Sequence, residues 1–382
     1  MPDIELIATA TFGLEALVAH ELRALGYEDM TVENGRVTFR ADESAVCRTN
    51  LWLRTADRVL LKMGSFKARS FEELFEKTRV LPWPDWLPSN ACFPVQGKSV
   101  RSKLFSVPDC QAIVKKAIVE KMKQKYRQEW FAEDGPQYTV EVALLKDEAT
   151  VTIDTSGPGL HKRGYRKLTA AAPLKETLAA ALVILAHWFP DRVLLDPFCG
   201  SGTIPVEAAL LGLNIAPGIK RGFACEGWPV ISAALWREAR DEAISLINNE
   251  DTLRIIGTDI DENVLSLARY HARAAGVEKH IRFQTMPVSG VRVKTQYGYI
   301  ICNPPYGERL GEVKQVESLY REMGRVFSVL DTWSCYILTS HPFFEQLFGR
   351  QADKRRKLYN GRIECQYYQY FGPRPPRRTK NS

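Results

Sequence analysis

The sequence of 382 residues has no long hydrophobic run. Its longest apolar stretches, such as residues 178–186, have nine residues, whereas a membrane-spanning helix needs about 20. The first residues, MPDIELIATA, lack the basic stretch and the apolar segment of a secretory leader. With 45% hydrophobic and 25% charged residues, the chain is expected to be a soluble globular protein of about two or three domains.

The eight cysteines include no CxxC pair. This spacing argues against a zinc site or a disulfide framework and favours reduced cysteines in a cytosolic protein. The histidines are scattered along the chain, so we expect no metal site. These absences predict a cytoplasmic protein without a metal and without membrane association.

The net charge of +7 is concentrated at one end of the chain. The last 32 residues hold nine Lys and Arg against two Asp and Glu, which accounts for the whole excess. A local basic excess favours a polyanion such as nucleic acid. A solvated tail explains the same pattern.

The first 155 residues have the pattern of two small α+β units. In residues 1–60, strand-like runs at 4–8 and 36–40 flank an amphipathic helix at 13–25. Residues 61–155 add a strand at 60–65, helices at 71–78 and 108–126, and a hairpin of 138–144 with 149–153. Residues 81–88 contain three prolines and predict a loop.

The pattern changes after a Gly-rich, basic segment, 156–170, which we interpret as a linker. Short apolar runs follow at 193–195, 253–256, 281–283, 299–302 and 335–338. Helical patterns separate these runs. Alternation of this kind predicts an α/β domain over 171–382 with a doubly wound, mostly parallel sheet.

The first chemical motif is Asp196-Pro-Phe-Cys-Gly-Ser-Gly-Thr203, between an apolar strand and an apolar helix. Its two glycines let the backbone approach a ligand at the carboxyl end of the strand, and the helix N-terminus favours an anionic group. It is neither a Walker A loop nor GxGxxG. A Gly-rich turn alone is weak evidence of function.

The second motif is Gly257-Thr-Asp-Ile-Asp261, at the end of the next long strand. A carboxylate there can accept hydrogen bonds from ribose hydroxyls. Asp259 is better placed for this role, and Asp261 is expected to cap the helix that starts at Glu262. For Asp259 taken alone, helix capping and ribose binding both stay open.

The third motif is Asn303-Pro-Pro-Tyr306, directly after the apolar run 299–302. The prolines fix the backbone, so the Asn303 side-chain oxygen and the Pro304 carbonyl are expected to point outward as acceptors. Two acceptors suit an exocyclic amine, which offers two N–H donors. Tyr306 can stack on a base. By itself, the motif is also explained as a turn that ends a strand.

Together, the three motifs resemble the class I S-adenosylmethionine (SAM) methyltransferases that modify exocyclic amines of nucleobases. The resemblance implies a catalytic set of Asn303, Pro304, Pro305 and Tyr306. It also implies SAM contacts from Asp196, Pro197, Phe198, Cys199, Gly200, Gly202, Thr203, Asp259 and Ile260. Many members hold the adenine of SAM with an acid after the third strand. Residues 282–290 contain no acid, so backbone groups or Ser289 are expected there instead.

The segments 163–166, 172–179, 223–228 and 357–361 resemble the THUMP-linked members of this family. That likeness implies a ferredoxin-like region over 1–60 and a THUMP RNA-binding domain over 61–155. It further implies methylation of guanine N2 in 23S rRNA, or in an assembly intermediate of the large subunit, by a monomer that releases S-adenosylhomocysteine (SAH). Within this setting we favour phosphate contacts for Arg355, Arg356, Arg377 and Arg378.

Four other functions fit part of the same pattern. They are an N6-adenine DNA methyltransferase, a tRNA guanine-N2 methyltransferase, a non-catalytic RNA-binding assembly factor and a protein glutamine methyltransferase. The Asn-Pro-Pro-Tyr motif does not separate adenine N6 from guanine N2. The RNA-binding-like first half favours RNA over DNA and over a protein substrate.

Overall fold

The computed structural model describes residues 4–166, 174–249, 252–307 and 313–376 and divides them into two packing units. Unit 1 comprises the described residues up to Thr11, together with Glu15–Leu160 and Arg221–Ala243. Unit 2 comprises Phe12–Leu14, His161–Lys220 and the described residues from Ile244 onward. Residues 167–170 of the predicted linker lie outside the described ranges.

Unit 1 is built on a seven-stranded sheet with the order β2-β3-β1-β4-β7-β6-β5. Neighbouring strands are antiparallel except for the parallel pair β5 and β6. The strands are β1 (Ile4–Ala10), β2 (Met30–Glu33), β3 (Arg36–Ala41), β4 (Ala56–Lys67), β5 (Val95–Val100), β6 (Val140–Leu145) and β7 (Glu148–Asp154). The hairpin β6–β7 confirms the prediction for that segment.

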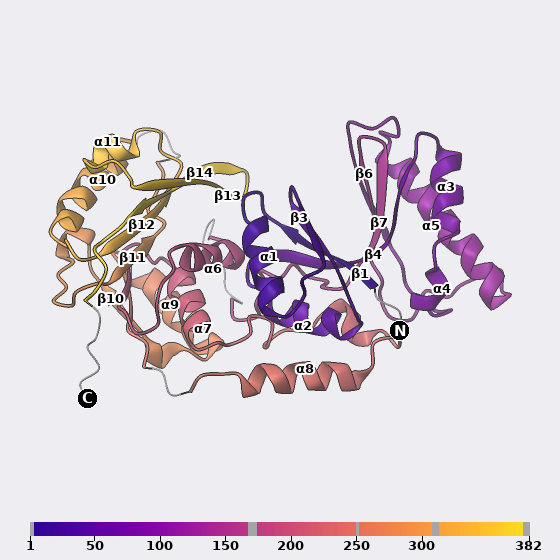
Figure 1. The fold of residues 1–382 in the computed structure, drawn as a ribbon, viewed down its shortest axis with the longest axis horizontal. Helices are drawn as coiled ribbons and strands as arrows, with labels where there is room; N and C mark the ends of the chain where they lie inside the picture. Colours follow the sequence, from indigo (N-terminus) through magenta and orange to yellow (C-terminus); the bar gives the residue numbers. More distant parts are fainter. Residues whose placement is uncertain (1–3, 167–173, 250–251, 308–312, 377–382) are drawn as a thin grey trace. The chain divides into compact units, whose positions relative to one another are not determined.

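The helices of unit 1 are α1 (Glu15–Ala24), α2 (Ser44–Trp52), α3 (Phe71–Arg79), α4 (Trp83–Trp86) and α5 (Val107–Tyr126). Figure 1 shows α3 and α5 on one side of the part of the sheet formed by β4, β7 and β6. The one-turn helix α4 corrects the prediction of a loop over 81–88. Pro82 precedes the helix, Pro84 lies in its first turn, where no backbone donor is needed, and Pro88 follows its end.

Unit 2 is built on a second seven-stranded sheet, with the order β10-β9-β8-β11-β12-β14-β13. The first five strands are mutually parallel, and β14 and β13 are antiparallel to their neighbours. They are β8 (Leu194–Asp196), β9 (Ile255–Asp259), β10 (Ile281–Thr285), β11 (Tyr299–Cys302), β12 (Ser334–Thr339), β13 (Lys354–Asn360) and β14 (Ile363–Tyr370). This sheet confirms the predicted fold class.

The helices that accompany this sheet are α6 (Glu176–Leu185), α7 (Thr203–Gly212), α9 (Glu262–Ala275), α10 (Val313–Ser328) and α11 (Phe344–Phe348). The 3₁₀ turns are η1 (Ala224–Gly227), η2 (Glu278–His280) and η3 (Val288–Gly290), and α8 spans Ala233–Ser245. Figure 1 shows α10 and α11 on one side of β11 and β12, with α6, α7 and α9 on the other. In the described ranges, no helix combines the length and apolar character needed to cross a bilayer.

The segment Arg221–Ala243 packs in unit 1, although it follows α7 of unit 2 in the chain. Trp228 is 1% exposed and stacks on Tyr138 with 4.4 Å between ring centroids. Its Nε1–H donates to Gln137 O at 3.0 Å. Arg48 of α2 pairs with Glu242 of α8 at 2.8 Å. The segment is therefore part of the unit 1 core.

Trp228→Ala is expected to destabilise unit 1 by about 3–5 kcal/mol, because it removes a buried aromatic ring and leaves a cavity. Denaturant unfolding measures the change. Trp130→Ala is the matched control, since Trp130 is 75% exposed. Equal free energies of unfolding for the two variants would contradict the packing of this segment.

Candidate active site

The three motifs meet at one edge of the unit 2 sheet. Strand β8 ends at Asp196, β9 ends at Asp259, and β11 ends at Cys302, directly before Asn303. Strand β8 lies between β9 and β11, and all three are parallel. Open α/β sheets bind ligands at the carboxyl ends of their parallel strands. We call this place the carboxyl edge.

The Gly-rich loop between β8 and α7 is held against the end of β9. The Cys199 N–H donates to Thr258 O at 3.0 Å, and the Gly200 N–H donates to Asp259 Oδ2 at 3.0 Å. Gly202, the N-cap of α7, has a φ of +81°, which L side chains rarely adopt. The motif therefore needs glycine where the loop turns into the helix.

Asp196 is buried beneath this loop. Its Oδ1 accepts the Phe198 N–H at 3.1 Å. Desolvation raises the pKa of the Asp196 carboxyl well above its usual range, and the nearby Asp259 raises it further. A buried carboxyl in this position is stabilised in its charged form by a cation. SAM carries a positive sulfonium and an ammonium group, so the chemistry of Asp196 fits that cofactor.

Asp259 and Asp261 have different roles. Both oxygens of Asp259 accept backbone N–H groups, Oδ2 from Gly200 at 3.0 Å and Oδ1 from Asp261 at 3.1 Å. Asp261 accepts the Asn263 N–H at 2.8 Å and caps α9, as predicted. Ile260 is strongly exposed beside Asp259. Asp259 is therefore not the helix cap, and its half-buried carboxyl is fixed at the carboxyl edge.

The first and last residues of the Asn303–Tyr306 motif are hydrogen-bonded to each other. The Tyr306 hydroxyl donates to Asn303 Oδ1, the oxygen predicted to accept an amine. Asn360 Nδ2 donates to the Tyr306 Oη at 3.5 Å. Burial raises the pKa of the Tyr306 phenol, so it remains a neutral donor near pH 7. Pro304 is buried and Pro305 is exposed.

Tyr320 of α10 supports this motif from behind, a contact that the sequence interpretation missed. Its hydroxyl donates to Pro305 O at 2.7 Å and lies 2.9 Å from Thr339 Oγ1, at the end of β12. The Tyr320 ring is fully buried and packs edge-on against Phe344 at 5.0 Å. The tyrosine thus ties the motif to the neighbouring strand.

Arg166, which the sequence interpretation also missed, fixes the end of the Gly-rich loop. The Arg166 guanidinium donates to Thr203 Oγ1 and to Leu174 O, and it pairs with Glu176 Oε1 at 3.1 Å. Burial raises the pKa of the Glu176 carboxyl, and Arg166 opposes that shift. An acid at the start of the otherwise apolar helix α6 is the sequence signal for this contact.

Glu207 is a comparable acid in the apolar helix α7. Its Oε1 accepts the Tyr165 hydroxyl at 3.0 Å and lies 3.5 Å from Arg163 Nε. All three side chains are buried. The segment around Arg163 and Tyr165 is therefore anchored to α7, the helix that follows the Gly-rich loop.

Other predicted contacts remain predictions. Arg355 pairs with Glu345 and Arg356 donates to Gly13 O at 2.9 Å, so both have partners inside unit 2. Arg377 and Arg378 lie outside the described residues. Ser289 is exposed and its carbonyl accepts a hydrogen bond from Arg292.

Cys199 is buried inside the Gly-rich loop. Burial, with Asp196 and Asp259 nearby, raises the pKa of its thiol well above the usual range, so the thiol stays protonated. Within the described ranges, no group of three or more His, Cys, Asp and Glu side chains is arranged to hold a metal ion.

Family models match three parts of the chain. The RMKL-like methyltransferase domain matches residues 163–369, the RlmL ferredoxin-like domain matches 5–60, and the THUMP domain matches 68–154. The first model alone covers more than half of the chain.

Curated relatives agree with these matches. The chain is 53% identical over 382 residues to YpsC of Bacillus subtilis (strain 168), described as a candidate RNA methyltransferase, and covers 99% of it. It is 35% identical over 380 residues to the ribosomal RNA large subunit methyltransferase K/L of Syntrophotalea carbinolica. That alignment covers 95% of this chain and 53% of the longer relative.

Two solved structures share the full fold. A predicted N6-adenine-specific DNA methylase from Listeria monocytogenes is 53% identical, with a TM-score of 0.94 and coverage of 98% of this chain and 97% of that one. SMU.472, a candidate methyltransferase solved with SAH, is 46% identical, with a TM-score of 0.94 and coverage of 98% and 99%. These matches confirm SAM as the cofactor.

Asp196→Asn is expected to weaken SAH and SAM binding at least tenfold without lowering the melting temperature of the free protein. Folding raises the pKa of the Asp196 carboxyl, so this group lowers stability progressively as the pH rises above the usual carboxyl pKa, and the loss is complete above the raised pKa. Asparagine keeps the acceptor for Phe198 N–H and carries no charge. Calorimetry and thermal unfolding at neutral pH measure both effects. Unchanged binding together with a lower melting temperature would contradict the assigned role.

Tyr320→Phe is expected to lower kcat about two- to tenfold, because one neutral hydrogen bond to the motif is lost while the ring remains. SAH affinity and the KM for nucleic acid should stay the same, as expected for a positioning residue. Tyr299→Phe, at the opposite end of β11, serves as the control. A change in KM with kcat preserved would assign Tyr320 to another role.

Proposed function

Because this chain belongs to the RMKL-like methyltransferase family, we propose that it transfers the methyl group of SAM to an exocyclic base amine of RNA, guanine N2 of 23S rRNA. The observation that carries the proposal is the shared carboxyl edge. There the Gly-rich loop, Asp259 and Asn303 come from three adjacent parallel strands. The THUMP match over 68–154 supports RNA as the substrate class.

Bound SAM supplies a methyl group on a positively charged sulfur, which is already activated for transfer. In our proposal the buried Asp196 carboxyl faces the positive charge of the cofactor. Residues 197–203 lie under its methionine end, and Asp259 accepts from its ribose hydroxyls. The hydrogen bonds from Gly200 and Asp261 orient the Asp259 carboxyl in advance.

Asn303 Oδ1 and Pro304 O hold the target amine by accepting hydrogen bonds from its two N–H groups. The amine nitrogen forms a bond to the methyl carbon while the carbon–sulfur bond breaks, and the nitrogen then loses a proton to solvent. The gain in rate comes mainly from positioning and electrostatics. No covalent enzyme intermediate is needed.

Binding of the base must break the contact between Tyr306 and Asn303. The Tyr306 hydroxyl already donates to the oxygen that the amine requires. An amine donor therefore replaces a phenol donor, and the released ring becomes available to stack on the base. The base has to be unpaired or flipped to enter.

The relatives leave more than one nucleic acid open. The K/L relative is named for large-subunit rRNA, whereas the Listeria structure is named for adenine N6 in DNA. The THUMP and ferredoxin-like matches favour RNA. Methylation of tRNA guanine, an assembly factor without catalysis and a protein glutamine methyltransferase are the remaining alternatives. We expect a cytoplasmic monomer that acts on rRNA or on a large-subunit assembly intermediate.

Incubation with labelled SAM and large-subunit rRNA, tRNA or duplex DNA from cells lacking the protein, followed by nucleoside mass spectrometry, tests the proposal. N2-methylguanosine in large-subunit rRNA is the expected product. N6-methyladenine in DNA would overturn the RNA assignment. Tight SAH binding without transfer to any of the three would favour an assembly intermediate or a protein as the substrate.

Asn303→Ala is expected to lower kcat about a hundredfold or more, because a preorganised group for the reacting amine is removed. The affinity for RNA should change little, since phosphate contacts dominate it. Asn303→Asp keeps acceptor oxygens and is expected to retain more activity than the alanine variant. Single-turnover rates and filter binding separate the two effects. Full turnover by Asn303→Ala would rule out the proposed role.

A further inference from the structure

Three loops meet at one end of strands β4, β5, β6 and β7 in unit 1, and Asp147 ties them together. Its Oδ1 accepts the Lys103 N–H at 2.7 Å, and its carbonyl accepts the Ala68 N–H at 2.9 Å. Its Oδ2 pairs with Arg69 Nε at 3.4 Å. One aspartate thus joins the end of β4, the β5–α5 loop and the β6–β7 turn.

Further hydrogen bonds fix the β5–α5 loop. The Lys146 N–H donates to Val100 O at 3.1 Å, and the Asp147 N–H donates to Ser102 Oγ at 3.0 Å. The Ser99 hydroxyl donates to Leu104 O at 2.7 Å. Because the loop is ordered by its own contacts, a ligand that binds it has little ordering entropy to offset.

This fixed end presents apolar side chains to solvent. Phe105 is 82% exposed, Val100 52% and Leu145 54%. Val100 and Leu145 are register partners in the parallel pair β5 and β6. Single exposed apolar residues are common, but several on one ordered end indicate a contact surface.

Cations surround these apolar side chains. Arg101, Lys103 and Lys146 are all exposed. Within the described part of the chain, no carboxylate pairs with any of the three. The nearby Asp147 is already used by backbone donors and by Arg69. Arg101 and Lys146 have φ values of 51° and 52°, so the backbone holds both in a conformation that is uncommon for such residues.

A concave face continues from this end across the sheet of unit 1. A cavity of about 660 Å³ is lined in part by Lys98, Val100, Leu145 and Thr152. Its lining also includes the carboxylates Glu33 and Glu141, which are paired with Arg36 and Lys98. Thr152 Oγ1 is buried there with no hydrogen-bond partner among the described residues. A ligand that contacts the exposed end can therefore extend over a polar surface beyond it.

We propose that this end, the tip surface (Val100, Arg101, Lys103, Phe105, Leu145 and Lys146), binds a single-stranded segment of RNA. The three cations contact phosphates, and one unstacked base lies on the Phe105 ring. Single-stranded nucleic acid is typically bound by cations that contact its phosphates and by exposed aromatic rings that stack on its bases. The inference rests on the proposed function, because RNA is taken as the substrate.

The test measures the affinity of the full chain for a labelled RNA hairpin with a single-stranded flank, by fluorescence anisotropy over a range of salt. Phe105→Ala is expected to weaken binding about five- to a hundredfold, the range for loss of one base stack. Lys103→Ala and Lys146→Ala are each expected to reduce the slope of log K against log salt by about 0.7.

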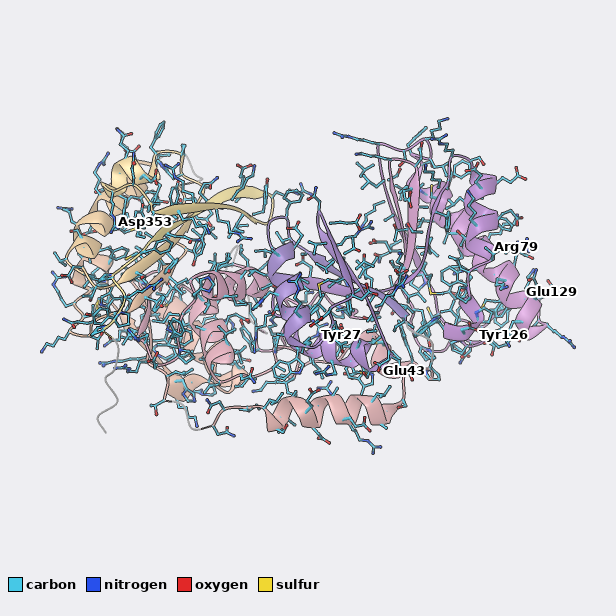
Figure 2. The ribbon with its side chains drawn as sticks, viewed as in Figure 1. Tyr27, Glu43, Arg79, Tyr126, Glu129 and Asp353 are labelled. Carbon is cyan, nitrogen blue, oxygen red and sulfur yellow. The ribbon has the colours of Figure 1, made fainter. Side chains whose placement is uncertain are left out.

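The matched controls lie at the other end of α5, roughly 30 Å away along the helix. Figure 2 labels Tyr126 and Glu129 at that end. Lys125→Ala removes one exposed charge there, and Trp130→Ala removes one exposed aromatic ring. Both variants should bind the RNA probe like the unchanged chain.

Outcomes for the tip surface and for the proposed function are separable. Normal probe affinity in all three tip variants, with wild-type methyl transfer to RNA, overturns only the tip surface. Weaker binding in the tip variants, with transfer to DNA alone, overturns the proposed substrate and leaves the surface in place. If the variants alter binding of a ribosomal protein and not of the RNA probe, the surface is a protein contact and the inference is wrong.

Discussion

The candidate active site depends on the close approach of the Gly-rich loop to the end of β9. Two hydrogen bonds make this approach, from Cys199 N–H to Thr258 O and from Gly200 N–H to Asp259 Oδ2. A Cβ at Gly257 would lie 2.9 Å from the Phe283 ring and 3.0 Å from Cys199 Sγ, so only glycine allows it. Without this approach, neither the loop nor the Asp259 carboxyl would have its observed position at the carboxyl edge.

The surrounding structure supports that edge with buried polar groups rather than with an apolar core alone. Arg166 holds Thr203, and Tyr320 holds the backbone after Asn303. Asp196 differs from these groups because its burial raises its pKa without a cation among the described side chains beside it. In the proposed function, a cationic cofactor stabilises the ionised form of this carboxyl, so ligand binding would offset a cost in stability that the free protein carries. Such local costs are typical of functional sites.

Much of the fold could be predicted because the signals are local. The apolar runs of the second half and the cap at Asp261 depend only on neighbouring residues, and the structure confirms them. Packing that joins distant segments could not be predicted. Trp228 packs in unit 1, although the chain before Arg221 and after Ala243 belongs to unit 2. The Tyr306 hydroxyl donates to the Asn303 oxygen that was expected to be free for a ligand. The sequence does not indicate the one-turn helix α4, because a proline-rich segment predicts a loop, although the first turn of a helix tolerates proline.

The contact between Tyr306 and Asn303 gives the account its most direct test. A crystal structure of the protein with a non-reactive SAM analogue and an RNA fragment that carries the accepted guanine would show the occupant of Asn303 Oδ1. We predict that the Tyr306 hydroxyl has left, that the base amine lies within hydrogen-bond distance of this oxygen, and that the Tyr306 ring stacks on the base. An analogue bound away from Asp196 and Asp259, or a base bound while the tyrosine still donates to Asn303, would contradict the account.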